Sequence, residues 1–508
     1  MFFPLLYSET HYHLRFLFPR YYKNEPEVLF DFPLRVVSER TDNTLIFFLI
    51  VKDADNFPGR ISDIKLDIFC HKQSYSIHLS EEIDVNEDYY FKQFRCPINQ
   101  EWINQSIYIK VYFKLKCINK IKTYINDNYY GNIPHQFKVF ISKDDYIYKK
   151  NWYRGDVHYH SNYTSDQVEF GAPIEVTKVI ANAMGIDWFF VTDHSYDLDD
   201  LSNNYLKNDP DLSKWHNMRE DCRINDRDKM RVISGEEVSI GNSFGENIHL
   251  LAINEDSFIK GSGDSAENWF KNKPENDLSI INDMQNDHNL FIAAHPFDKV
   301  PISQKLLLNR GNWSETDFKL SEIKYLQIIN GQDIFEVKQM VKKWIELLLE
   351  GNKYYILAGN DAHGNFQFMK QISIPFLKLM CRKQQLFGQY FTMFHNELND
   401  PIKGIKKNRV IISNGPFIEF FLDDKTIGET FLFSNAVIRY DIVTNLEFGG
   451  VKNIILYIGN IETKRVIQIK DFENNLSITL PKKGFCILSL ETKKGFYAIT
   501  NPIYIEVT

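Results

Sequence analysis

The spacing of apolar residues changes twice along this chain of 508 residues, and each change predicts a boundary between domains. Over residues 1–150 apolar and polar residues alternate, most clearly in Ile107–Cys117. A period of two is typical of strands that bury one face and expose the other. We therefore predict an N-terminal β-sandwich domain over residues 1–150.

Residues 151–412 follow another pattern, in which short apolar runs alternate with amphipathic segments. A helix is predicted between Pro173 and Gly185, because proline favours the first helical turn and glycine favours the position after the last. Strands that alternate with helices favour parallel βα units, and a region of this length has the size of a barrel. The predicted strands are Asp156–Tyr159, Trp188–Thr192, Arg231–Ser234, Ile248–Ile253, Phe291–Ala294, Tyr325–Ile329 and Tyr355–Ala358.

The period of two returns in residues 413–508. Ile487–Leu490 is typical of a strand, and Thr492–Gly495 is typical of a hairpin turn. We predict a second, smaller β-domain over residues 413–508.

Charge and cysteine content limit the partners and the compartment. Lys and Arg number 59 against 67 Asp and Glu, and the net charge of -8 makes a nucleic-acid partner unlikely on electrostatic grounds. Six cysteines without a CxxC pair indicate neither a disulfide framework nor a thiolate zinc site, which favours a reducing, cytoplasmic compartment.

No membrane segment is predicted. The start of the chain, Met1–Leu6, lacks the basic flank and the small cleavage-site residues of a signal peptide. The longest apolar run, Leu45–Val51, is far shorter than the ~20 residues that a membrane helix needs. The sequence predicts no particular oligomeric state.

Ionisable residues gather where the strands of the middle region are predicted to end. His158 and His160 lie two apart and share one face of a strand, as do Asp361 and His363, so each pair is able to chelate an ion. Imidazole with carboxylate and without thiolate suits zinc, manganese, iron or nickel, and the donors are too many for one tetrahedral ion. We therefore predict two or three divalent ions. The residues in question are His158, His160, Asp166, Asp193, His194, Glu236, Glu237, His249, His295, Asp361 and His363.

A single histidine is more often a core or surface residue than a metal ligand, and the prediction depends on the whole set. His11 and His13 repeat the same spacing without nearby acids, so we interpret them as two positions on a β-strand. His216 lies in a polar excursion over residues 197–229, where it could cover the site and contact a substrate.

These residues also form ordered motifs. They are Gly155–His160 (GDVHYH) followed by Asp166, Thr192–His194 (TDH), Gly235–Glu237 (GEE), His249–Leu251 (HLL), Ala294–Pro296 (AHP) and Gly359–His363 (GNDAH). In this order they resemble the motifs of the PHP (polymerase and histidinol phosphatase) superfamily. Asn414–Pro416 (NGP) and Ala498–Ile503 (AITNPI) resemble, more narrowly, the CehA/McbA-type metallohydrolases.

The resemblance implies an α/β fold: a distorted (β/α)7 PHP barrel over residues 151–412, flanked by N-terminal and C-terminal β-sandwich-like domains. It also implies three groups of ligands, with Glu237 bridging the first two. They are His158, His160, Glu237 and Asp361; Glu237, His249 and His295; and Asp166, His194 and His363. The family's Gly-x-Glu spacing selects Glu237, and Glu236 is the alternative. The sequence departs from the family's pattern at Asn360 and Gln167, neither of which is a ligand position.

The implied activity is hydrolysis, most plausibly of a phosphoester, by a hydroxide that bridges two ions, since coordination lowers the pKa of water towards ~7. Glu237 and His194 would be catalytic as ligands, and Asp193 would either orient a ligand or cap a helix. Lys299 is a candidate for binding phosphate, although a solvated lysine is the commoner case. The alternatives are a carbamate or carboxylic ester hydrolase with the same site, and an inactive barrel that carries glycan- or protein-binding β-modules.

Overall fold

The computed structural model describes residues 24–129, 134–146, 149–164, 171–202, 204–227, 229–261, 273–364, 366–367, 371–374, 377–380, 385–432 and 435–507. Asp166, Gln167, His11 and His13 lie outside the described residues, as does the start of the chain. Among the described residues, no helix is long and apolar enough to cross a membrane.

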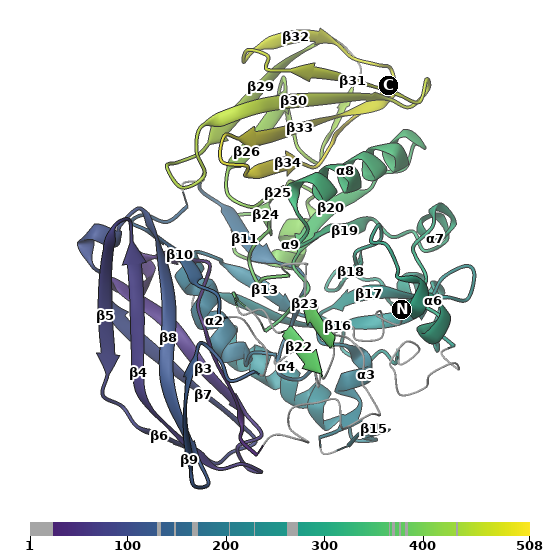
Figure 1. Ribbon diagram of the computed structural model, residues 1–508. Helices are drawn as coiled ribbons and strands as arrows, with labels where there is room; N and C mark the ends of the chain where they lie inside the picture. Colours follow the sequence, from purple (N-terminus) through teal and green to yellow (C-terminus); the bar gives the residue numbers. More distant parts are fainter. Residues whose placement is uncertain are drawn as a thin grey trace.

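The N-terminal domain is built from two sheets (Figure 1). Strands β1 (Glu27–Asp31), β3 (Thr44–Lys52) and β7 (Tyr89–Pro97) form the first sheet. Their inward side chains share one buried core with the second sheet, which includes Phe47 from β3 and Phe113 from β8. The second sheet contains β2 (Arg35–Val37), β10 (Phe137–Ser142), β8 (Gln105–Cys117), β4 (Gly59–Cys70), β5 (Gln73–Leu79), β6 (Ile83–Val85) and β9 (Lys120–Ile125).

The middle strands belong to one 15-stranded sheet that continues into the C-terminal domain. Along its main path the order is β20-β19-β18-β17-β16-β13-β11-β24-β25-β34-β33-β30-β31, and β28 and β35 lie off this path. The strands are β11 (Trp152–Asp156), β13 (Trp188–Val191), β16 (Arg231–Gly241), β17 (Asn247–Ile253), β18 (Leu290–Ala293), β19 (Tyr325–Asn330), β20 (Tyr355–Gly359), β24 (Phe391–His395), β25 (Val410–Ser413), β28 (Thr430–Leu432), β30 (Val451–Asn460), β31 (Arg465–Lys470), β33 (Gly484–Thr492), β34 (Tyr497–Thr500) and β35 (Ile503–Glu506).

The predicted (β/α)7 barrel is therefore wrong. Strands β11, β13 and β16 are parallel, and so are β18, β19 and β20, but β17 is antiparallel to both of its neighbours. Only a short turn separates β16 from β17, which makes them a hairpin and leaves no room for a helix. On its other side β11 pairs with antiparallel β24, so the sheet runs on towards the C-terminal domain.

Helices are few beside the strands (Figure 1). The helix predicted after Pro173 is confirmed as α2 (Ile174–Met184), and Gly185 ends it with a left-handed φ of 86°. The longest helix of the described chain, α8 (Ile334–Leu349), begins where the Asp333 side chain accepts two backbone N–H groups. The others are α3 (Ser195–Leu198), α4 (Ser213–Asn225), α5 (Ser279–Met284), α6 (Ile302–Leu308), α7 (Glu315–Leu320) and α9 (Pro401–Lys406).

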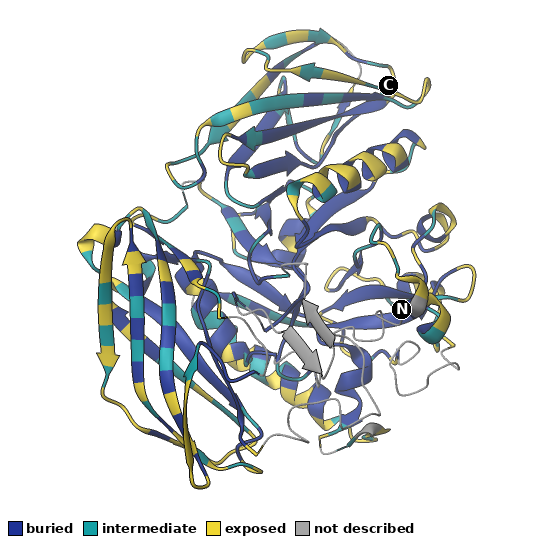
Figure 2. Ribbon diagram, viewed as in Figure 1, coloured by how far each residue is buried: buried dark blue, intermediate teal, exposed yellow. Residues whose placement is uncertain are grey.

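The C-terminal domain adds a four-stranded sheet in the order β27-β26-β29-β32. It packs against the far end of the long sheet around a core that includes Phe420 and Leu488. Figure 2 shows that the strands between the two outer domains are buried along most of their length. The four strands are β26 (Phe417–Leu422), β27 (Lys425–Thr426), β29 (Asn435–Val443) and β32 (Leu476–Thr479).

One buried cluster of charge and aromatic rings joins the three regions. Arg35 of the N-terminal domain forms an ion pair of 2.7 Å with Glu447 of the C-terminal domain, and their side chains are 3% and 9% exposed. The guanidinium of Arg35 lies over the ring of Tyr146, and that of Arg154 lies over the same ring. Tyr146 in turn stacks on Phe448. This cluster, which we call the joint, therefore connects the three regions to one another.

We predict that Arg35→Ala lowers the free energy of unfolding by about 3–5 kcal/mol, because it leaves the carboxylate of Glu447 buried without its cation. Urea unfolding followed by tryptophan fluorescence measures the change. Arg60→Ala is the matched control, since the ion pairs of Arg60 with Glu82 and Asp84 are exposed and we expect no measurable change. Equal stability of the Arg35 variant and the wild type would contradict the assigned role of the joint.

Candidate metal centre

The first ligands are positioned where β11 ends. His158 follows β11, and His160 lies in β12 (Tyr159–His160), which pairs in parallel with β21 (Ala362–His363). The register places His160 beside His363, and their rings stack with centroids 4.2 Å apart. The two predicted chelating pairs, from opposite ends of the middle region, are thus brought side by side.

The carboxylate of Glu237, on β16, lies at the centre of the cluster. An isolated backbone bridge joins Glu237 to His194, which lies three residues after β13. Oε2 of Glu237 lies 3.2 Å from Nε2 of His158, 3.2 Å from Nε2 of His160 and 3.1 Å from Nδ1 of His194. All four side chains are buried.

The other oxygen of Glu237 faces a second pair of imidazoles. Its Oε1 lies 2.5 Å from Nδ1 of His249, on β17, and 3.0 Å from Nε2 of His295, which follows β18. One carboxylate therefore contacts five histidines, with three on one oxygen and two on the other.

Asp361 supplies the second carboxylate. Its Oδ1 lies 3.3 Å from Nε2 of His158 and 3.1 Å from Nε2 of His160. Its Oδ2 accepts hydrogen bonds from the amides of Asn330 and Gln385 at 3.2 and 2.8 Å, so these fix the orientation of the carboxylate.

The backbone at two of the ligands is strained. Asp361 has a φ of 51° and His295 a φ of 30°, values that residues with a side chain rarely adopt. Strained backbone is retained where the surrounding structure holds it, and it is common at functional sites.

The donor atoms divide into three groups, in each of which all atoms lie within 4.8 Å of one another. The first two have the composition that the resemblance implied. In the third, His160 joins His194 and His363, while Asp166 lies outside the described residues. The groups are His158, His160, Glu237 and Asp361; Glu237, His249 and His295; and His160, His194 and His363.

The residues fit divalent ions by their chemistry and by their unused atoms. Among the described residues, Oε2 of Glu237 and both ring nitrogens of His194 are buried and form no hydrogen bond of good geometry, although imidazole nitrogens lie 3.1–3.2 Å from Oε2. Burying such atoms is unfavourable unless something binds them. The other ring nitrogens of two ligands are held by partners, since Nδ1 of His158 contacts Gln327 at 2.8 Å and Nδ1 of His363 contacts the carbonyl of Asp361 at 3.1 Å. Such contacts direct the opposite nitrogen towards a metal.

The electrostatics of the cluster favour charged carboxylates. Burial alone raises the pKa of Glu237, but the nearby imidazoles, His249 and His158 first, hold it well below its usual value. Burial also raises the pKa of Asp361. The nearby His158 and His160 lower this pKa by more than burial raises it, so it too lies well below its usual value. Both carboxylates are therefore ionised at neutral pH and able to bind cations.

Glu236, the alternative to Glu237, points elsewhere. Its oxygens accept hydrogen bonds from the indole of Trp215 at 2.8 Å and from the backbone N–H of Ile259 at 3.2 Å. Burial raises the pKa of Glu236 to about 8, so this carboxyl is mostly neutral at pH 7.

Asp193 holds the backbone near the ligands. Its carboxylate accepts hydrogen bonds from the backbone N–H and hydroxyl of Ser161 and from those of Thr164, at 2.7–3.1 Å. This arrangement fixes the turn that follows His160. Asn360, a departure from the family pattern, donates to buried Asp156 at 2.6 Å.

A small cavity of about 40 Å³ adjoins the His249 side of the cluster. Buried Arg310 lines it, and Nη2 of Arg310 lies 3.0 Å from Nδ1 of His249. Exposed Lys299, the candidate for binding phosphate, lines the same cavity. Sequence reasoning missed Arg310, which lies in a loop without a motif. It also missed Gln327 and Asn330, although their place on the strand Tyr325–Asn330 was a usable signal.

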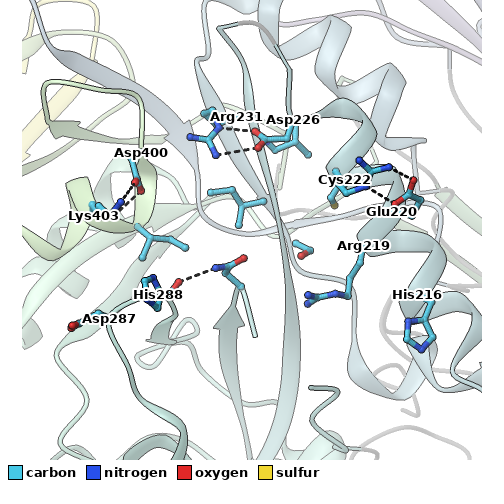
Figure 3. Close-up of a pocket in the computed structure, with 16 residues that line it drawn as sticks. His216, Arg219, Glu220, Cys222, Asp226, Arg231, Asp287, His288, Asp400 and Lys403 are labelled. Atoms are coloured by element: carbon cyan, nitrogen blue, oxygen red, sulfur yellow. Dashed lines mark hydrogen bonds and ion pairs between the residues drawn. The ribbon is translucent and has the colours of Figure 1, made fainter. Parts of the chain in front are cut away.

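A larger cavity of about 510 Å³ lies near the start of β16, and Figure 3 shows His216 at its edge. Arg231, which lines it, is six residues before Glu237, or roughly 20 Å along an extended strand. The cations in it are largely paired, as Arg231 is with Asp226 and Lys403 is with Asp400. His216 therefore lines a different cavity from the one beside the cluster.

Comparisons with known proteins identify no family. No protein-family model matches the chain, and no curated protein matches it. Similar solved structures include Parabacteroides merdae β-glucuronidase with glycerol in its active site, at 9% identity, a TM-score of 0.20 and coverage of 95% of this chain and 64% of that one. Bacteroides uniformis β-glucuronidase 2, covalently bound to cyclophellitol-6-carboxylate aziridine, has 9% identity, a TM-score of 0.21 and coverage of 95% and 61%.

A glycosyl hydrolase family 2 member from Bacteroides cellulosilyticus has 10% identity, a TM-score of 0.18 and coverage of 96% and 63%. The chain thus spans less than two thirds of the length of these three proteins. TM-scores near 0.2 do not indicate a shared fold, so these similarities support no conclusion about fold or substrate.

We predict that Glu237→Gln lowers the metal content of the purified protein by two ions per chain, because Glu237 belongs to two ligand groups. Elemental analysis after dialysis against Zn²⁺ or Mn²⁺ measures the content. Glu236→Gln is the matched control. It replaces a carboxyl that is mostly neutral at pH 7, so we expect an unchanged metal content. Equal losses in both variants would show that the substitutions act through folding.

Proposed function

We propose that the protein is a metal-dependent hydrolase of phosphoesters. The observation that carries the proposal is the buried carboxylate of Glu237, which is shared between two groups of candidate ligands. A shared carboxylate is suited to holding two divalent ions close together, the arrangement used for displacement at phosphorus. The resemblance of the ordered motifs to the PHP superfamily, and more narrowly to CehA/McbA-type enzymes, supports the same activity.

Bound zinc, manganese or iron ions would activate water as a nucleophile and polarise the bond under attack. The chain's own residues provide the geometry for this chemistry. Asn330 and Gln385 orient Asp361, and Gln327 orients His158. The carboxylate of Asp361 and the imidazole of His158 are thereby aimed at the cluster before any substrate arrives.

Charge favours an anionic substrate over a neutral ester. Two carboxylates, Glu237 and Asp361, do not neutralise two divalent ions, and buried Arg310 adds a further positive charge at the neighbouring cavity. A guanidinium binds the oxygens of a phosphoryl group with two parallel hydrogen bonds. A cavity of about 40 Å³ has room for only a compact group. Arg310 is therefore assigned to binding the phosphoryl oxygens, with Lys299 near the entrance.

We predict that Arg310→Ala lowers kcat/KM for p-nitrophenyl phosphate by roughly 10²–10³, as removal of one charge-stabilising donor does in other enzymes. Hydrolysis of the neutral ester 1-naphthyl acetate should change much less. Lys299→Ala, in the same cavity but exposed, is the matched control and should have the smaller effect.

A panel of p-nitrophenyl phosphate, bis-p-nitrophenyl phosphate and naphthyl esters on metal-loaded protein tests the proposal as a whole. Faster turnover of the neutral esters would favour the carbamate or carboxylic ester alternative. A protein that holds no divalent ion and hydrolyses nothing would support the inactive scaffold with binding modules.

A further inference from the structure

We infer that Asp31, in the N-terminal domain, is a positioning residue for the ligand group formed by His160, His194 and His363. The inference rests on the proposed metal centre and extends it, because it makes one group of ligands dependent on a domain that contributes no ligand among the described residues. The N-terminal domain would then complete the catalytic centre.

The contact begins at the last residue of β1. Asp31 is 1% exposed, and its two carboxylate oxygens accept the backbone N–H groups of Phe366 and Gln367 at 2.8 and 2.9 Å. These two residues follow His363 by three and four positions. The carboxylate thus holds the backbone that leaves the ligand.

The same segment is held at a second point. The side chain of Gln367 donates to the carbonyl of Pro33 at 2.7 Å and accepts the backbone N–H of Lys138 at 2.8 Å. Phe366 is fully buried, in the same apolar cluster as Leu29 and Phe48 of the first N-terminal sheet. Two side-chain contacts and one buried ring therefore attach this segment to the N-terminal domain.

The backbone of the ligand His363 is held as well. The backbone N–H of Gly171 donates to the carbonyl of His363 at 3.0 Å, and the hydroxyl of Tyr89, from β7, donates to the carbonyl of Gly171. Gly364 has a φ of 70°, and a Cβ there would lie 1.9 Å from the nitrogen of Ala172. His363 is therefore tied to the N-terminal domain through Gly171 and Tyr89, in addition to the segment that follows it.

A metal ligand must be held within about half an ångström of its productive position, and loss of a supporting contact commonly weakens metal binding by 10–100-fold. Asp31→Asn keeps the size of the side chain, but its NH₂ group faces a backbone N–H and makes no hydrogen bond with it. We expect the variant to bind one ion, the one assigned to His160, His194 and His363, at least ~10-fold less tightly, with the other ions retained.

The experiment uses the full chain and equilibrium dialysis against graded Zn²⁺, with elemental analysis of the bound ions and circular dichroism to establish folding. Asp67→Asn is the matched control in the same domain, because Asp67 contacts Lys65 on its own strand β4 and Ser76 on the neighbouring β5 and lies in the other sheet from Asp31. We expect its zinc binding to equal that of the wild type.

A double-mutant cycle separates positioning from general stability. If Asp31 acts through His363, then Asp31→Asn causes no further loss of zinc in a His363→Ala background. Full additivity of the two losses would overturn the inference. Should Asp31→Asn fail to fold, Gln367→Ala removes the second attachment and is expected to weaken the same ion.

The outcomes for the two proposals are distinguishable. If the wild type binds no divalent ion, the proposed function fails. If the wild type binds its ions and Asp31→Asn binds them equally well, the inference about Asp31 fails and the proposed function stands.

Discussion

The arrangement of the middle region depends on the buried carboxylate of Glu237 and the imidazoles around it. A carboxylate without solvent is unstable unless positive charge or hydrogen-bond donors surround it. Here five histidines from different strands and loops supply that surrounding. β16 lies between β13 and β17, so the residue that two of the three ligand groups share lies inside the sheet and not at its edge.

The convergence of these side chains could be predicted from sequence because the spacing within each pair is local. His158 with His160, and Asp361 with His363, show their shared face within three residues, and their place at the ends of apolar runs suggested a common edge. The direction of the strands carries no such local signal, because buried parallel and antiparallel strands both appear as short apolar runs. The β16–β17 hairpin and the pairing of β11 with β24 therefore contradicted the barrel.

The residues that support the ligands were harder to predict. Gln327 and Asn330 sit on a strand whose apolar neighbours dominate its pattern, and Arg310 becomes relevant only once the fold brings its loop to His249. The contact between Asp31 and Phe366 spans 335 residues of sequence. Neither periodicity nor a motif predicts a hydrogen bond between a side chain and a backbone group so far away in the sequence.

The continuity of the long sheet has a practical consequence for anyone who wishes to isolate the portion that carries the histidine and carboxylate cluster. Ending the chain after β25 would remove β34, the strand that pairs with β25. The backbone donors and acceptors along that edge of the apolar β25 would then be unpaired. Exposed edges of this kind recruit other chains. A fragment cut at the apparent domain border would therefore tend to self-associate, and shorter versions of the protein are better obtained by trimming outer hairpins than by removing a whole domain.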